Sequence, residues 1–178
     1  MHLDGSRIAN AAASLGVSMR AFTTTVGVDI LSFGGTKNGA LLGEAVVVVN
    51  PDVVSHMKHL RKLSMQLHSK MRFVSVQLEA LLAKDLWLRN AQHANAMAQR
   101  LADGVSAVNG VEILYPVQAN AVFARLPHDV SKRLQQRFRF YFWDEAAGDV
   151  RWMCSFDTTE DDVDMFIAAV EKEMGARG

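Results

Sequence analysis

The first fifty residues alternate between helical and strand-like patterns of apolar positions. Residues 6–16 predict a helix, because their apolar residues are spaced at i, i+3, i+4 and i+7 and Gly16 is placed to end it. Two apolar runs, 28–33 and 44–49, predict strands. The second run is continuous and β-branched, which is typical of a strand covered on both faces. The apolar positions of the helix are Ile8, Ala11, Ala12 and Leu15.

Residues 51–104 are helical in character, because charged and apolar positions mix with few helix breakers. Asn50 and Pro51 indicate the start of a helix, with proline at the first helical position. The stretch 69–103 fits either one long helix or two. Together with the preceding strands, this gives the order helix, strand, loop, strand, helix, which favours the second half of an α/β sheet.

Residues 111–175 predict a small separate α/β unit. Alternating apolar residues predict its strands, and an apolar stripe with a cap at Thr158 or Thr159 predicts its last helix. Trp143 and Trp152 are expected to anchor its sheet. We therefore expect three parts in the chain, at 1–50, 51–104 and 105–178. The expected strands are 111–116, 120–126, 139–143 and 149–156, with a turn at 145–148 and a short helix at 130–138.

The composition favours a cytoplasmic protein. The 178 residues carry 19 Lys and Arg and 19 Asp and Glu, so zero net charge gives no electrostatic reason to expect nucleic acid or an anionic membrane as partner. Apolar runs are too short to span a bilayer, and we expect no signal peptide. A single cysteine, Cys154, excludes an internal disulfide and reads as a buried small hydrophobe in a reducing compartment.

Two residues could carry chemistry, Asp4 and Lys37. Asp4 stands where the strand before the first helix would end, and Lys37 stands just after the next expected strand, 28–33. Parallel strands joined by a right-handed helical crossover can be neighbours, and their carboxyl ends then face one crevice. A lysine and an acid at such a crevice suit pyridoxal phosphate (PLP): the lysine forms the Schiff base, and the carboxylate keeps the pyridine nitrogen protonated. The alternative is a solvated lysine in a glycine-rich loop and an aspartate that only caps a helix.

The glycines around Lys37 favour a constrained loop. Gly34, Gly35 and Gly39 indicate either a close approach of the backbone to a neighbouring group or a positive φ. The alternative reading is an ordinary tight turn.

Two longer motifs, HLDGSRIANAAASLG and LSFGGTKNGALLGEAVV, resemble the lysine-bearing region of threonine aldolases and related β-eliminating lyases. The similarity continues through KMRFVSVQLEALL, DLWLRNAQHANAMAQRLA, QANAVFARLP and VRWMCSFDTTEDDVD, and so covers nearly the whole chain. The resemblance implies an α/β chain that is the C-terminal part of a fold-type-I PLP enzyme. That part would include a partial large-domain sheet, linking helices and a small C-terminal α/β domain.

The resemblance assigns a role to each of five residues. Lys37 matches the Schiff-base lysine, and Asp4 matches the acid that pairs with the pyridine nitrogen. Arg7 matches the arginine of the family's Asp-Gly-x-Arg motif, beside cofactor and substrate. Arg72 resembles an arginine that reaches the cofactor phosphate from a neighbouring subunit, although the family's glycines around it are absent. Arg151 resembles the arginine that binds the substrate carboxylate.

The residue pattern around Arg151 agrees with that role. Strand alternation places Arg151 on the face opposite Trp152 and Cys154, and a guanidinium can bind a carboxylate through two parallel hydrogen bonds. The alternative is an exposed strand arginine. A metal site is not expected, because no acid or cysteine completes a set with the helical histidines, so a wet helix face is the simpler reading. These histidines are His56, His59 and His68.

The resemblance implies a PLP-dependent carbon–carbon lyase of amino-acid metabolism that cleaves threonine to glycine and acetaldehyde, and a homo-oligomer, either a dimer or a tetramer. Another PLP reaction, β-elimination or transamination, fits the same scaffold. The family's subunit is about twice this length. Its first half supplies the cup for the cofactor phosphate and a ring that stacks on the pyridine, and we recognise neither here. The chain alone could therefore be inactive, or an assembly partner of another polypeptide.

Overall fold

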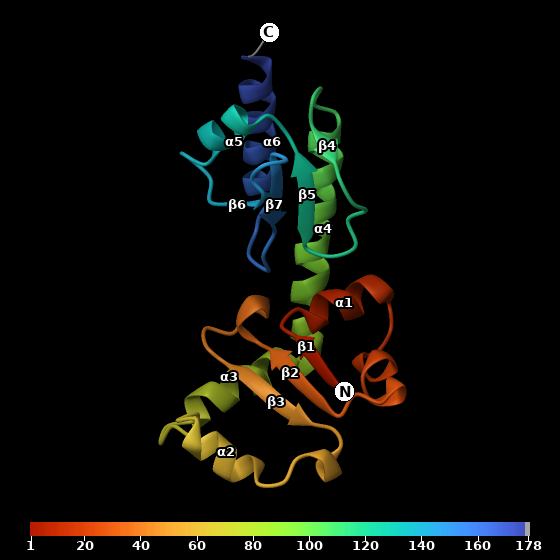
Figure 1. Ribbon diagram of the computed structural model, residues 1–178, viewed down its shortest axis with the longest axis vertical. Coiled ribbons are helices and arrows are strands. Elements are labelled where there is room, and N and C mark those ends of the chain that lie inside the picture. Colours follow the sequence, from red (N-terminus) through yellow and green to blue (C-terminus); the bar gives the residue numbers. More distant parts are fainter. Residues whose placement is uncertain (177–178) are drawn as a thin grey trace. The chain divides into compact units, whose positions relative to one another are not determined.

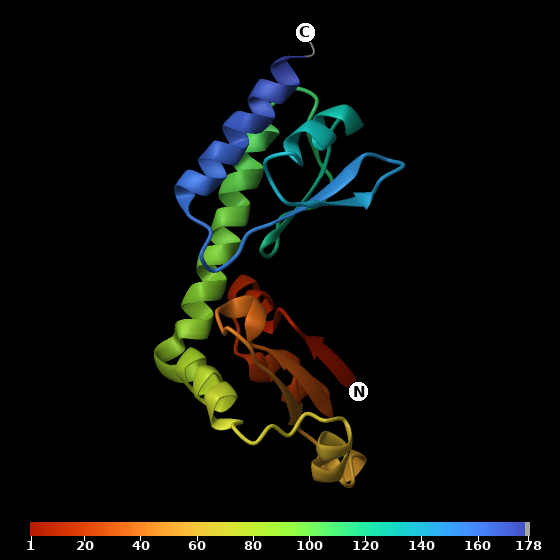
Figure 2. The same ribbon diagram turned by 90° about the vertical axis from the view of Figure 1, so that its left-hand side faces the viewer.

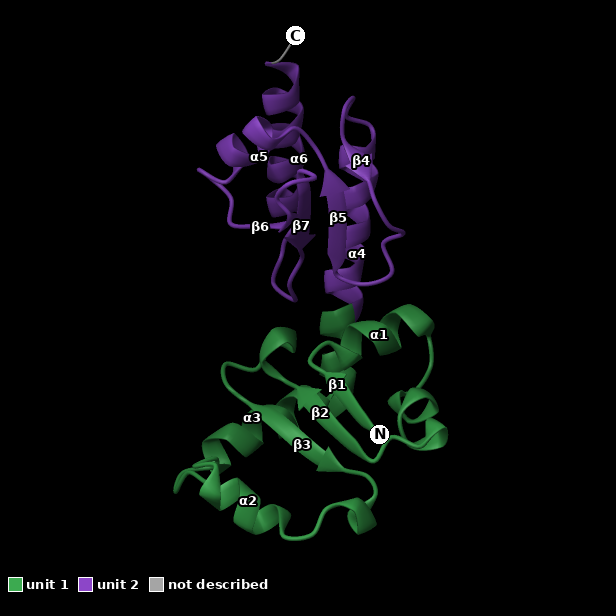
Figure 3. Ribbon diagram, viewed as in Figure 1, with its two compact units in different colours: residues 1–91 green, residues 92–178 purple. Residues whose placement is uncertain are grey.

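The computed structural model of the protein describes residues 1–176 and has an α/β architecture (Figure 1). It separates into two compact units, Met1–Ala91 and Gln92–Gly178, which are coloured separately in Figure 3. The boundary between them falls within one helix, α4 (Leu86–Ser106). Each unit has its own sheet, as the sequence predicted for the two ends of the chain. The expected division at 1–50, 51–104 and 105–178 stays a prediction.

The sheet of the first unit has the strand order β1-β2-β3. Strand β1 (His2–Gly5) pairs in parallel with β2 (Ile30–Gly34), and β2 pairs antiparallel with β3 (Glu44–Val48). Helix α1 (Ile8–Leu15) forms the crossover between the two parallel strands. The expectation that these strands are parallel neighbours is confirmed.

Helix α1 ends as the sequence predicts, but its buried stripe is shorter than expected. Gly16 adopts φ 65° and its N–H bonds the carbonyl of Ala12, a left-handed helix end that glycine adopts without a Cβ clash. Ile8 and Ala12 are buried, whereas Leu15 is 61% exposed, so the expected stripe ends one turn early. Ile8 packs with Val28, Leu31 and Phe33 in the apolar cluster of this unit.

Strand β3 departs from the prediction of a strand covered on both faces. Val46 and Val47 point to opposite faces and are 60% and 40% exposed. Strand β3 lies at the edge of the sheet among the described strands, and its only strand partner there is β2. The sequence identified the strand correctly, but the described chain covers its faces only in part: Ala45 packs against the apolar cluster of this unit, whereas Val46 and Val47 stay exposed.

The segment that follows is helical but interrupted. Asn50 accepts a hydrogen bond from the N–H of Asp52 and starts the short 3-10 turn Pro51–Val53. Helix α2 (Met57–Leu63) and helix α3 (Arg72–Leu82) follow. Lys84 and Asp85 then have φ of 51° and 56°, a left-handed conformation that separates α3 from α4. The stretch 69–103 is therefore two helices.

The second unit contains a four-stranded antiparallel sheet in the order β4-β5-β7-β6, together with helices that complete the fold. Most of its elements fall within one to three residues of the predicted ranges, although β4 is shorter than expected. Helices α4 and α6 run side by side on one side of the sheet (Figure 2). The elements are β4 (Glu112–Ile113), β5 (Ala121–Arg125), α5 (His128–Leu134), β6 (Tyr141–Asp144), β7 (Asp149–Met153) and α6 (Glu160–Gly175).

The core of the second unit lies on one face of this sheet. Val150, Trp152 and Cys154 alternate along β7 and the residues after it and are at most 4% exposed, which confirms the predicted inward face. Trp152 belongs to this core. Trp143 is 56% exposed and lies outside it, with its ring centroid 5.1 Å from that of Phe123 in β5.

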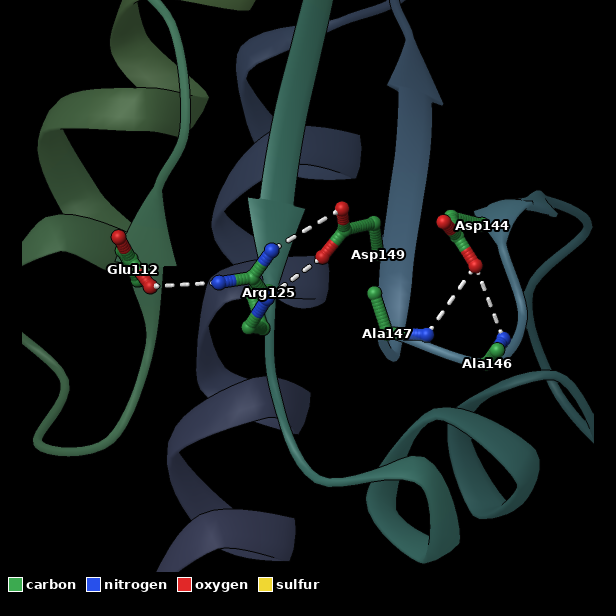
Figure 4. A network of polar contacts seen from close by, with 6 residues as sticks. All are labelled: Glu112, Arg125, Asp144, Ala146, Ala147 and Asp149. Carbon is green, nitrogen blue, oxygen red and sulfur yellow. Dashed lines mark hydrogen bonds and ion pairs between the residues drawn. The ribbon is translucent and has the colours of Figure 1, made fainter.

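The β6–β7 turn is fixed by polar contacts (Figure 4). Asp144 Oδ1 accepts hydrogen bonds from the backbone N–H groups of Ala146 and Ala147, at 3.0 and 3.1 Å. Across the neighbouring strands, Arg125 donates to both carboxylate oxygens of Asp149, at 2.7 and 3.2 Å. The bidentate pair aligns β5 with β7.

Helix α6 begins with a capping box. The hydroxyl of Thr159 accepts from the N–H of Asp162 at 3.1 Å, and the Asp162 carboxylate accepts from the N–H of Thr159 at 2.9 Å. Of the two expected caps, Thr159 is therefore the one used. Among residues 1–176, no helix is both long enough and apolar enough to cross a bilayer.

Candidate active site

Asp4 lies near the carboxyl end of β1, and Lys37 lies just beyond the carboxyl end of the parallel strand β2. Asp4 is in β1 in register with Ser32 of β2, and Lys37 follows the end of β2 at Gly34. Both side chains are exposed. The charge of Lys37 is close enough to help lower the pKa of Asp4, after the larger effect of hydrogen bonds from Ser6. Asp4 and Lys37 therefore lie at the same end of the parallel strand pair, and their role in holding a cofactor stays a prediction.

Ser6 holds the Asp4 carboxylate through two donors. Its backbone N–H donates to Asp4 Oδ1 at 2.9 Å, and its hydroxyl donates to the same oxygen at 2.6 Å. Hydrogen bonds to the charged form favour that form, so both bonds lower the pKa of Asp4. On the same strand as Asp4, His2 has its Nε2 2.9 Å from the Oγ of Ser32 in β2. The charge of His2 adds a smaller effect that also lowers the pKa of Asp4.

The loop that carries Lys37 is anchored on both sides. Lys37 sits in the 3-10 turn Thr36–Asn38. The buried amide of Asn38 donates to the carbonyl of Trp87 at 2.9 Å, and the amide of Asn90 donates back to the Asn38 carbonyl at 2.9 Å. Before the lysine, the Thr36 hydroxyl lies 3.3 Å from the backbone N of Gly43. Lys37 is therefore an exposed amine on a fixed backbone.

The loop glycines are required by close packing and by backbone conformation. A Cβ on Gly34 would lie 2.5 Å from the carbonyl oxygen of Ser6, and one on Gly35 would lie 2.6 Å from that of Gly43. Gly39 adopts φ 115°, which disfavours any other residue. Both expected reasons for the glycines are confirmed, and the group approached by Gly34 is the Asp4 loop itself.

The three arginines occupy different places. Arg7 directly precedes α1, three residues after Asp4 in the sequence, and its side chain is exposed. Arg72 is the first residue of α3, and its guanidinium lies 4.9 Å from the ring centroid of Phe73. Arg151 belongs to the second unit, in β7, and its guanidinium lies 5.4 Å from the ring centroid of Trp143. A ring below a guanidinium restricts its orientation through a cation–π contact.

Ser6, Asn38 and Asn90 were missed by sequence reasoning. Ser6 lies two residues after Asp4, and an aspartate followed at that distance by a residue that can donate twice is a local signal for such a turn. Asn38 and Asn90 are far apart in sequence, and no local pattern joins them. Among the described residues, no group of three or more His, Cys, Asp or Glu is arranged to hold a metal ion.

A family model described as beta-eliminating lyase matches residues 1–128, which include Asp4 and Lys37. The chain belongs to the beta-eliminating lyase family. Members of this family use PLP. The donor set of this lyase chain fits that cofactor, because an exposed amine and an ionised carboxylate lie at the same sheet edge, next to a backbone that is held in place.

Two curated relatives of this lyase chain are named low specificity L-threonine aldolase. The protein from Pseudomonas aeruginosa is 41% identical over 177 residues, and that from Pseudomonas sp. is 40% identical over 177 residues. Each alignment covers 99% of this chain and 51% of the relative. The chain thus spans about half the length of these relatives and corresponds to their C-terminal half.

Solved structures agree on the fold. A threonine aldolase from Leishmania major superimposes with a TM-score of 0.86 at 26% identity, covering 97% of this chain and 51% of that one. A 4-hydroxyphenylacetaldehyde synthase from Rhodiola rosea gives a TM-score of 0.70 at 15% identity, covering 98% and 43%. The predicted fold class, the C-terminal portion of a fold-type-I PLP enzyme, is confirmed.

Proposed function

We propose that the enzyme to which this chain contributes is a PLP-dependent aldol lyase that cleaves β-hydroxy-α-amino acids, with threonine giving glycine and acetaldehyde. Two observations support the proposal: Asp4 and Lys37 share one sheet edge, and the Pseudomonas relatives carry the threonine aldolase name. The observation that carries it is the first, because it concerns atoms of this chain. PLP, when bound, supplies the electron sink that this bond cleavage needs.

Each residue has a distinct proposed role. The Lys37 amine attaches the cofactor covalently, and the Asp4 carboxylate holds the proton on the ring nitrogen. Arg151 binds the substrate carboxylate through two parallel hydrogen bonds. Arg7 lies beside cofactor and substrate, and Arg72 reaches the cofactor phosphate of a neighbouring subunit. We place the enzyme in the cytoplasm as a homo-oligomer, either a dimer or a tetramer.

The decisive experiment is titration of the purified chain with PLP, followed by borohydride reduction and peptide mapping. We expect reduced PLP on Lys37 in the wild-type chain and none in Lys37→Ala, with Lys62→Ala as the matched control at an exposed helical lysine. Persistence of the same PLP absorbance in Lys37→Ala, with another lysine modified, would refute the role of Lys37.

A second candidate reaction is β-elimination, which the description of the matching family model favours. Transamination is a further reaction that the same scaffold could support. Product analysis with threonine, serine and aromatic amino acids separates these reactions. Acetaldehyde and glycine from threonine support aldol cleavage, pyruvate and ammonia from serine support elimination, and an oxo acid that retains the substrate skeleton supports transamination.

A third candidate is a chain that acts only beside another polypeptide, because it spans about half the length of its curated relatives. Mixing the chain with the first half of a relative tests this role. Recovery of PLP binding only in the mixture supports an assembly partner, and binding by the chain alone contradicts it. Arg72→Ala, measured in the same mixture, tests the proposed phosphate contact, since PLP affinity should fall while the fold is kept.

A further inference from the structure

The two oxygens of the Asp4 carboxylate have unequal surroundings. Oδ1 accepts both hydrogen bonds from Ser6, at 2.9 Å from the backbone N–H and 2.6 Å from the hydroxyl. The hydroxyl bond is in the short range that is usual for a hydroxyl donating to a charged oxygen. Neither of these two Ser6 donors contacts Oδ2. Ser6 therefore holds one carboxylate oxygen and does not occupy the other.

We propose that Ser6 is a positioning residue that fixes which oxygen of Asp4 would meet the cofactor: Ser6 holds Oδ1 and leaves Oδ2 to accept from the ring N–H when PLP is bound. The identity of that ring rests on the proposed function. That Ser6 contacts Oδ1 and not Oδ2 rests only on contacts within this chain.

Gly34 fixes Ser6 in turn. A Cβ on Gly34 would lie 2.5 Å from the carbonyl oxygen of Ser6 and 2.7 Å from its Cα, so the backbone of Ser6 is seated directly on the end of β2. Strand β2 leads into the loop of Lys37 three residues later. The donors that hold Asp4 are thus placed by the same backbone that places the lysine. Gly34 therefore places the backbone of Ser6, and Ser6 in turn holds the carboxylate of Asp4.

This arrangement has a chemical consequence for the shared proton. Two donors on Oδ1 withdraw charge from the carboxylate and make it a weaker base, in line with the lowered pKa of Asp4. A weaker base leaves the proton on the ring nitrogen. Ser6 therefore does more than orient Asp4, because it also sets how strongly Asp4 competes for that proton.

The test measures Asp4 without cofactor. Protein labelled with carboxyl-¹³C aspartate is titrated by NMR, and the Asp4 signal is assigned by its loss in Asp4→Asn. We expect Ser6→Ala to shift the Asp4 pKa upward, and Ser6→Thr, which keeps the hydroxyl, to leave it near the wild-type value. Ser75→Ala, at an exposed serine of α3, is the matched control and should cause no shift. Thermal unfolding of each variant checks that the fold is kept.

A second measurement follows the ring proton in the PLP-loaded protein. With ¹⁵N in the pyridine, Ser6→Ala should move the nitrogen signal toward its unprotonated value, and Ser6→Thr should not. An unchanged Asp4 pKa in a folded Ser6→Ala protein, or equal shifts in the Ala and Thr variants, overturns the proposal. A shifted Asp4 pKa in a chain that does not bind PLP supports the role of Ser6 and counts against the proposed function alone.

Discussion

The side-chain amide of Asn38 donates a hydrogen bond across 2.9 Å to the carbonyl oxygen of Trp87, at the start of helix α4. Asn38 is the residue after Lys37 and is 5% exposed. The proposed cofactor lysine is therefore tied, through its neighbour, to a helix almost fifty residues further along the chain.

Asn38→Ala should lower the free energy of unfolding by about 1–3 kcal/mol, because the carbonyl of Trp87 loses its donor in a partly buried place. Urea unfolding followed by circular dichroism measures this. Asn90→Ala removes the other bond of the pair and should behave similarly. Asn109→Ala, at an exposed asparagine, is the control, and an equal loss there would show that the Asn38 contact is not responsible.

Gly34→Ala should destabilise the first unit by about 1–3 kcal/mol, since the new methyl group would overlap the Ser6 backbone. Gly16→Ala introduces the same methyl group in open space at φ 65°, and should cost only about 1 kcal/mol. Comparison of the two melting temperatures separates close packing from backbone conformation. The interpretation fails if Gly16→Ala is the more damaging change.

Thr159→Ala should lower the free energy of unfolding by about 1 kcal/mol at pH 7, because helix α6 loses its cap. Thr159→Ser keeps the hydroxyl and serves as the control. The hydrogen bonds of Thr159 hold the pKa of Asp162 below its ordinary 3.8. A lowered carboxylate pKa contributes stability that is present above pH 3.8 and is lost as the pH falls through the lowered value. The penalty of Thr159→Ala should therefore be smaller at pH 2 than at pH 7, as two urea titrations would reveal.

Cys154 should react slowly with a disulfide reagent at pH 8 in the folded protein. Its side chain is 4% exposed, and burial raises the pKa of its thiol to about 11, so almost no thiolate is present. In urea the thiol should recover a pKa of about 8.5 and react fast. The absorbance of the coloured thiolate that the disulfide reagent releases measures the labelling rate of the folded protein and that of the protein in urea. Fast labelling of the folded protein would contradict the predicted burial.

The placement of Asp4 and Lys37 at the same end of two neighbouring strands could be predicted from sequence, because parallel strands joined by a helix place their carboxyl ends together. Local rules also identified Gly16 as a helix end and Thr159 as one of two possible caps. These features depend on residues a few positions apart, or on a topology that has few alternatives.

Other features depend on contacts or conformations that a single sequence does not encode locally. The bonds of Asn38 join segments about fifty residues apart. Lys84 and Asp85 adopt a left-handed conformation without glycine, so the break between α3 and α4 has no local signal. The run 44–49 is β-branched and apolar, so its composition predicts a strand buried on both faces. Composition does not show whether a neighbour is present to cover those faces, and Val46 and Val47 are exposed.

That exposed edge has a practical consequence for anyone handling this polypeptide at high concentration. Among the described strands, β3 has a partner on one side only, and it carries two water-exposed valines, which is the arrangement that recruits strands from other molecules. Turbidity and loss of material during purification should then originate in the first unit, and a lysine at position 46 is the substitution of choice for keeping samples dispersed.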